Sequence, residues 1–244
     1  MNYLANFLTT LSLVCGFASI IFSLESQFTF ASWAIILSVI FDGIDGQIAR
    51  RNPVPSEFGK ELDSLVDVVS FGIAPSILGY IFIYQDFYSW ATLALFAYLA
   101  CSIFRLAKYN ITPKEKLVNC FIGLPTTAGG GILASFILIY RKKQGMALPV
   151  FIPHILLPKF VPILFVCLVL LIAFLMVSRV RYLNLDGLRQ LFGKKIKLIL
   201  LILIVLLTLA AVFRKVGVAV FGLFLIYLIF SPLVVKRLNH NLPG

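Results

Sequence analysis

The sequence predicts an all-α integral membrane protein, and three observations support this fold class. Of the 244 residues, 61% are hydrophobic and only 13% are charged, and the mean hydropathy is +1.02. This composition lies outside the range of soluble globular domains. The apolar residues form runs of roughly 20, the length that a helix needs to cross a hydrocarbon core of about 30 Å. The Lys and Arg residues gather between these runs.

We expect about eight membrane-spanning helices, in this order along the chain: residues 3–24, 28–48, 62–84, 87–107, 119–140, 157–178, 196–213 and 216–235. The first run is too long, and has too little basic charge before it, for a cleaved signal peptide. An N-terminus inside the cell places most of the 21 Lys and Arg residues on the cytoplasmic side. Both termini are therefore expected to be cytoplasmic.

Four aspartates gather at the ends of the second and third helices, in a chain with only 10 acidic residues. Asp42 and Asp45 are three residues apart and Asp63 and Asp67 are four apart, so each pair lies on one helix face. An aspartate at membrane depth costs roughly 2.5 to 3.5 kcal/mol on insertion scales, so four carboxylates need a compensating cation. Oxygen ligands without His or Cys favour Mg²⁺ or Mn²⁺ over zinc. Four acids could hold two such ions.

The segment between the two acid pairs is expected to turn the chain back. Pro53 and Pro55 disfavour a helix just ahead of them, and Ser56 is a suitable N-cap for the next helix. This turn would bring the second acid pair opposite the first. Gly46 and Ala49 lie near Asp42 on the helical wheel and lack bulk, so a large ligand could approach the backbone there.

Eight positions of this region carry a resemblance to a known family. The pattern is DxxDGxxAR, then eight residues, then GxxxDxxxD, and it resembles the signature of the CDP-alcohol phosphotransferase family. Each fixed position of the signature is filled in this sequence, by Asp42, Asp45, Gly46, Ala49, Arg50, Gly59, Asp63 and Asp67. The family transfers a phosphatidyl group from a CDP-linked lipid to an alcohol and releases CMP. The resemblance implies an enzyme whose site faces the cytoplasm.

The same resemblance implies a role for each signature residue. Asp42, Asp45 and Asp63 would bind the metal, and Asp67 would act as the general base while also touching a metal. Gly46, Ala49 and Gly59 would allow close approach of the cytidine nucleotide. For Arg50 two roles remain open, because it could pair with a substrate phosphate or with one of the carboxylates.

Four further stretches narrow the resemblance to the phosphatidylserine synthase branch, namely residues 8–17, 61–75, 121–127 and 176–182. This branch implies CDP-diacylglycerol and L-serine as substrates, membrane lipids as surroundings, a bacterial cytoplasmic membrane and a homodimer. On physical grounds the acceptor stays open between serine, glycerol 3-phosphate and inositol phosphate. Residues 1–182 would form the catalytic membrane domain, and 183–244 an interfacial segment followed by two helices without a signature.

Four polar residues are candidates for binding the acceptor or a phosphate: Ser70, Arg105, Lys108 and Asn110. Arg105 and Lys108 share one face at the cytoplasmic end of the fourth helix, where a substrate anion needs a cationic partner. The alternative is that they are anchors that extend to the membrane surface. Ser70 could instead hydrogen-bond its own helix backbone.

Other functions are less well supported. The four cysteines are scattered and lack metal or disulfide spacing, and neither histidine is near the motif. The net charge of +11 is dispersed over helix ends, which favours anionic lipid headgroups over nucleic acid as partners. A cation transporter remains a distant alternative, because membrane-embedded acids often bind ions.

Gly129 to Gly131 would let the fifth helix pack closely against its neighbours.

Overall fold

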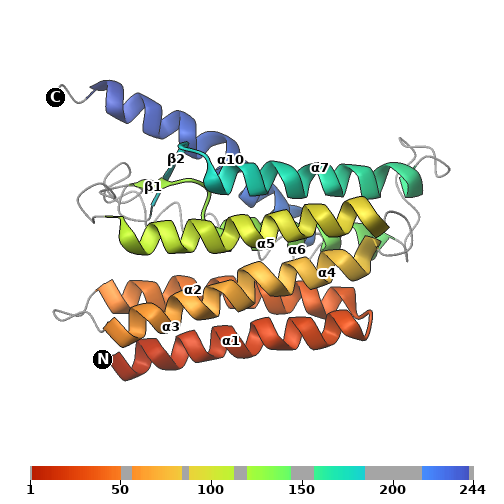
Figure 1. Ribbon diagram of the computed structural model, residues 1–244, viewed down its shortest axis with the longest axis horizontal. Helices are drawn as coiled ribbons and strands as arrows, with labels where there is room; N and C mark the ends of the chain where they lie inside the picture. Colours follow the sequence, from red (N-terminus) through yellow and green to blue (C-terminus); the bar gives the residue numbers. More distant parts are fainter. Residues whose placement is uncertain are drawn as a thin grey trace.

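The computed structural model describes residues 2–50, 57–83, 88–112, 120–143, 157–184 and 216–241 as a bundle of roughly aligned helices (Figure 1). The α-helices are α1 (Asn2–Leu24), α2 (Phe28–Arg50), α3 (Glu57–Asp67), α4 (Ala74–Ile83), α5 (Tyr88–Ile111), α6 (Thr126–Lys143), α7 (Leu157–Val177) and α10 (Val216–Asn241). A π-helical segment, η1 (Val68–Ile73), joins α3 to α4, and two short strands, β1 (Cys120–Ile122) and β2 (Arg181–Leu183), pair with each other.

The mostly helical structure confirms the predicted fold class. Five spans are long and apolar enough to cross a membrane: Tyr3–Leu24, Phe28–Ala49, Glu57–Ile83, Trp90–Ile111 and Val216–Val235. They match five of the expected helices. The apolar parts of α6 and α7, Thr126–Tyr140 and Val161–Val177, are shorter. The expected helix over residues 196–213 lies outside the described residues. In Figure 1, α1 begins and α10 ends at the same end of the bundle.

The expected helix over residues 119–140 begins too early, and this prediction is wrong at its start. Residues 120–122 form β1, which runs antiparallel to β2. Gly123 follows with a φ of 78°, and a side chain there would overlap the carbonyl oxygen of Met176. Because a residue before proline avoids the helical conformation, α6 starts only after Pro125. The closely packed segment 123–125 places the N-terminus of α6 beside β1 and β2.

Pro75 shapes the third membrane span through the π-helical segment that precedes it. Proline has no N–H, so the Phe71 carbonyl four residues earlier loses its usual α-helical donor. The helix widens just before this point, and the Ala74 N–H bonds Val69 O, five residues back. The Tyr98 hydroxyl on α5 donates to Phe71 O at 2.6 Å. One tyrosine therefore satisfies the carbonyl that the proline exposes.

Replacing Tyr98 by phenylalanine should destabilise the protein. Tyr98 is fully buried, so Tyr98→Phe leaves the Phe71 carbonyl without this donor, at a cost of about 1 to 3 kcal/mol. Thermal unfolding in detergent should show a lower midpoint than wild type. Tyr3→Phe is the matched control, because Tyr3 is 90% exposed, and it should leave the midpoint unchanged. Equal midpoints for Tyr98→Phe and wild type would contradict this role.

Small residues let the helices around the third span approach closely, as predicted for Gly129 to Gly131. A Cβ at Gly130 would lie 3.3 Å from Phe71 Cα, and one at Gly131 would overlap the ring of Phe224 on α10. On the opposite side, a serine pair joins α1 to α2, with Ser12 Oγ 2.7 Å from Ser38 Oγ. The close approach at Gly130 and the packing of η1 against both α1 and α6 hold η1, and with it the end of α3, between those two helices.

Candidate active site

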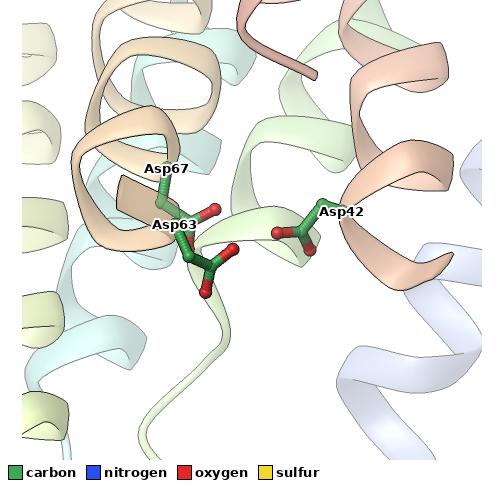
Figure 2. A group of neighbouring side chains, drawn as sticks. All are labelled: Asp42, Asp63 and Asp67. Atoms are coloured by element: carbon green, nitrogen blue, oxygen red, sulfur yellow. The ribbon is translucent and has the colours of Figure 1, made fainter. Parts of the chain in front are cut away.

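Three of the four signature aspartates meet in space. Asp42 comes from α2, and Asp63 and Asp67 come from neighbouring turns of α3. One carboxylate oxygen of each lies within 4.8 Å of those of the other two. Figure 2 shows the Asp42 carboxylate pointing from its helix toward the other two. The structure thus places Asp42 of the first acid pair opposite both acids of the second pair.

The electrostatics of these three carboxylates call for a cation. Two unit charges 4.8 Å apart repel by about 3.5 kcal/mol at an effective dielectric constant of about 20. Asp67 is only 8% exposed, and its Oδ1 is buried with no hydrogen-bond partner among the described residues. A hard divalent cation takes such oxygen ligands. The donor set and the unpartnered oxygen both fit a metal site formed by Asp42, Asp63 and Asp67.

Asp45 lies outside this group of three. It is 2% exposed, and its Oδ2 accepts a 2.7 Å hydrogen bond from the Thr9 hydroxyl on α1. Its Oδ1 is buried and has no hydrogen-bond partner in the described part of the chain. Thr9 also donates to Ala5 O, so α1 fixes the orientation of Asp45. Thr9 lies within the stretch 8–17 that carries the resemblance, but its spacing in the sequence does not indicate a contact with Asp45, which is 36 residues away.

Arg105 is connected to Asp67 by hydrogen bonds through the hydroxyl of a threonine. Its Nη1 donates to Thr126 Oγ1 at 3.1 Å, and the Thr126 hydroxyl donates to Asp67 Oδ2 at 3.5 Å. The guanidinium also lies 5.5 Å from the ring centroid of Tyr109 and 5.8 Å from that of Phe121. Arg105 is only 8% exposed, and its Nε has no partner among the described residues. A buried cation therefore lies next to the carboxylate group.

A cavity of about 630 Å³ opens over the three acids. Its lining includes Gly46 on α2, Arg105 and Asn110 on α5, Thr126 on α6, and Tyr227 on α10. No atom lies within 4 Å of a Cβ added at Gly46, so the backbone there is open to a ligand. The volume is in the range of small-molecule sites. The cavity therefore joins an acidic group, a buried cation and an open backbone surface.

The other predicted site residues lie elsewhere. Lys108 lines a separate cavity of about 60 Å³, which it shares with Arg105. Ser70 is buried and donates to Ser12 O at 3.2 Å on α1. Ala49 is exposed and Gly59 is half-buried, and neither is among the described residues that line the large cavity. The side chain of Arg50 lies outside the described part of the structure.

Sequence comparison now connects this geometry to a family. The family model for CDP-alcohol phosphatidyltransferase matches residues 2–157, which include all four aspartates. The chain belongs to the CDP-alcohol phosphatidyltransferase family. It is therefore a membrane transferase of phospholipid synthesis, and the group of three carboxylates lies within the part of the chain that the family shares.

Three relatives extend the comparison, and each is named CDP-diacylglycerol–serine O-phosphatidyltransferase. A Helicobacter pylori protein is 34% identical over 225 residues, covering 91% of this chain and 87% of its own. A Methanocaldococcus jannaschii protein is 37% identical over 54% of this chain and 59% of its own. A Bacillus subtilis protein is 32% identical over 58% of this chain and 78% of its own.

The site of this family member also contains residues that the sequence did not indicate. Lys60 Nζ donates to Asn110 O at 3.2 Å, and Asn110 Nδ2 donates to Ser64 Oγ at 2.8 Å, so α3 and α5 are tied together at the cavity. The position of Lys60, three residues before Asp63 on the same helix face, was an available signal. The sequence held no signal for the cavity residues of α10, because only the tertiary structure brings that helix to the site.

Proposed function

We propose that the protein transfers the phosphatidyl group of CDP-diacylglycerol to the hydroxyl of L-serine, giving phosphatidylserine and CMP. The observation that carries this proposal is the meeting of Asp42, Asp63 and Asp67 in the floor of one cavity. The shared family supports the transfer, and the names of the three relatives support serine as the acceptor.

The transfer is a displacement at phosphorus. The serine hydroxyl oxygen attacks the phosphorus that carries the diacylglycerol, and the bond from that phosphorus to the oxygen bridging to CMP breaks. CMP leaves with the bond electrons. We assign Asp67 as the general base that takes the hydroxyl proton, because a hydroxyl is a weak nucleophile until its proton is removed. The Asp67 carboxylate lines the large cavity, where it can reach the hydroxyl of a bound acceptor.

We propose that Asp42, Asp63 and Asp67 hold a divalent cation, Mg²⁺ or Mn²⁺. When bound, such an ion offsets the repulsion between carboxylates and pyrophosphate and stabilises charge on the leaving phosphate. The signature's four acids suggest two ions. The fourth acid, Asp45, contributes a buried Oδ1 without a described partner, and Thr9 holds its other oxygen.

The remaining polar residues would position the two substrates. We assign the open backbone at Gly46 to the cytidine nucleotide, with Ala49, Arg50 and Gly59 in the same region by family resemblance. Arg105 lines the cavity as a buried cation, which suits a phosphate or the carboxylate of serine. Asn110 lines the same cavity, while Lys108 lies in the smaller one.

We further propose the membrane arrangement that the charge pattern predicts. Eight helices cross a bacterial cytoplasmic membrane, both termini are cytoplasmic, and the acids face the cytoplasm, where serine is available. The common end of α1 and α10 in Figure 1 agrees with termini on one side. A homodimer is proposed from the family resemblance alone. Residues 1–182 would form the catalytic domain, and 183–244 would follow it.

An acceptor panel tests this function. Purified protein in detergent receives CDP-diacylglycerol with Mg²⁺ or Mn²⁺, and CMP release is followed with L-serine, glycerol 3-phosphate or inositol phosphate. Release with serine alone is expected. Release with another acceptor alone would keep the family and overturn serine. If no acceptor supports release, the cation-transport alternative becomes the better account of the acids.

Thr126 should influence catalysis as a positioning residue. Thr126→Val removes the hydroxyl between Arg105 and Asp67, and a lost hydrogen bond of this kind costs about tenfold in rate. We expect kcat to fall by about this factor with the KM for CDP-diacylglycerol unchanged, and Thr126→Ser to restore it. Thr10→Val is the control, because the exposed Thr10 hydroxyl bonds only its own helix backbone in the described structure. An equal loss in the valine and serine variants would contradict this role.

A further inference from the structure

In the third membrane span, one residue of the active site and two residues of the apolar core lie at the same helical spacing. Ala74 follows Asp67 by seven residues and Leu78 follows by eleven, so in an uninterrupted α-helix all three would share one face. Ala74 and Leu78 are fully buried in the apolar core, whereas Asp67 lines the large cavity. One face of a regular helix would therefore have to meet both surroundings.

The π-helical segment η1 separates these two requirements. A π-helix closes its hydrogen bonds over five residues instead of four, so one π-helical turn takes up one extra residue. In an α-helix one residue corresponds to about 100° of rotation. The residues before η1 are thus turned by about 100° relative to those after it. This offset lets α4 bury Ala74 and Leu78 in the core while α3 presents Asp63 and Asp67 to the cavity.

Helix α1 packs against η1 with no room for a side chain at Gly16. A Cβ at this position would lie 2.8 Å from Ser70 Cα, whereas carbon atoms normally approach to about 3.5 Å. One turn earlier on α1, the carbonyl of Ser12 accepts a hydrogen bond from the Ser70 hydroxyl at 3.2 Å. Ser70 lies three residues after Asp67, so α1 supports η1 in the turn that follows the acid.

Two other helices enclose the next residues of η1. A Cβ at Gly72 would lie 2.9 Å from Ser102 Oγ on α5, and one at Gly130 on α6 would lie 3.3 Å from Phe71 Cα. Close contacts from α1, α5 and α6 therefore hold three successive residues of η1. Among these contacts, the one at Gly16 is nearest to Asp67 along the chain.

We infer that η1 turns Asp63 and Asp67 into the cavity, and that Gly16 is a positioning residue that holds η1 in this geometry. Gly16 is not among the described residues that line the cavity. It acts through the backbone of Ser70, because a displacement there moves the end of α3 and with it the Asp67 carboxylate. The inference rests on the proposed function only in assigning Asp67 to the chemistry.

Gly16→Ala tests the contact with α1. The added methyl group requires α1 and η1 to separate by about 1 Å before normal contact is restored, and a misplacement of about 1 Å can cost about 10²-fold in rate. We expect kcat for CMP release to fall by about this factor, with the KM for CDP-diacylglycerol unchanged. Gly222→Ala is the matched control, because no described atom lies within 4 Å of a Cβ added there. Equal kcat values for the two alanine variants would overturn the role of Gly16.

Ser70→Gly provides a rescue that a loss of stability alone would not show. It removes Cβ and Oγ of Ser70, two of the three atoms nearest to the added methyl group. Gly16→Ala should therefore lower kcat less in the Ser70→Gly protein than in wild type, and a double-mutant cycle measures this coupling. Equal losses in both proteins would mean that the effect does not pass through η1, which would overturn the inference.

Cysteine labelling tests the orientation of α3 without substrate or metal. The native cysteines are replaced by alanine, and a water-soluble maleimide is added. It should label Ser64→Cys, which lines the cavity, but not Leu62→Cys, which is not among the described lining residues. Deleting Val69 should return η1 to an α-helix and turn α3 by about 100°, so that residue 62 takes the former place of Asp63.

In the deletion protein we expect the two labelling results to exchange, with Leu62→Cys labelled and Ser64→Cys protected. An unchanged pattern in a deletion protein with the wild-type elution volume would show that other contacts orient α3, and would overturn the inference. Because neither CDP-lipid nor serine is added, this result stands apart from any failure of the proposed transfer.

Discussion

Asp67→Asn should lower kcat for CMP release by about 10² to 10⁴, the usual contribution of a general base. The amide keeps the size of the side chain but accepts no proton. It also removes one charge from the group of three carboxylates, so metal affinity should fall as well. The measurement is CMP release from CDP-diacylglycerol at saturating L-serine and at several Mn²⁺ concentrations. Saturating Mn²⁺ should restore binding of the ion without restoring kcat.

Glu61→Gln is the matched control for this substitution. Glu61 lies on the same helix as Asp67, but it is exposed and is not among the described residues of the cavity. We expect the control to keep wild-type kcat, and both variants to keep the wild-type elution volume in size-exclusion chromatography. An Asp67→Asn enzyme within about threefold of wild-type kcat would remove Asp67 from the general-base role.

Removing divalent cations should abolish turnover. With the three carboxylates close together and at least one oxygen of Asp67 buried without a described partner, chelation leaves the acids to repel both each other and the donor pyrophosphate. We expect no measurable CMP release in excess EDTA and full recovery when Mg²⁺ or Mn²⁺ is added back. Turnover that persists through chelation and dialysis would contradict the metal role of this group.

Thermal unfolding gives a readout of the same site without catalysis. A ligand that binds only the folded state raises its stability in proportion to RT ln(1 + [L]/Kd), so Mn²⁺ should raise the wild-type midpoint. Asp42→Asn should lose most of this rise. In EDTA the same variant should unfold at or above the wild-type midpoint, because one repelling charge is gone. A variant that Mn²⁺ stabilises as much as wild type would show that the ion binds elsewhere.

The acids could be predicted from sequence because their placement follows from helical geometry. Asp63 and Asp67 share a face at four-residue spacing, and the chain between Arg50 and Asp63 is long enough for one turn-back. The prediction that Asp42 lies close to these two residues followed directly from this spacing and this turn. The position of Asp45 did not, because its hydrogen bond depends on a threonine 36 residues away.

Other parts of the site depend on contacts between distant segments, which a periodicity argument does not contain. Thr126 reaches Asp67 only because Gly123 and Pro125 delay the start of α6, and the sequence analysis had placed that helix earlier. Tyr227 reaches the cavity because α10 packs on α6 and β2. A helix without a recognisable motif therefore forms one wall of the site.

The most direct test of the account follows both products at once. Purified protein in liposomes receives CDP-diacylglycerol, radiolabelled L-serine and Mn²⁺ or Mg²⁺, and labelled lipid and CMP are quantified together. The account predicts labelled phosphatidylserine with one CMP released per lipid formed, and neither product in EDTA or with Asp67→Asn. Labelled lipid formed at the wild-type rate by Asp67→Asn, or CMP released while no serine enters the lipid, would contradict it.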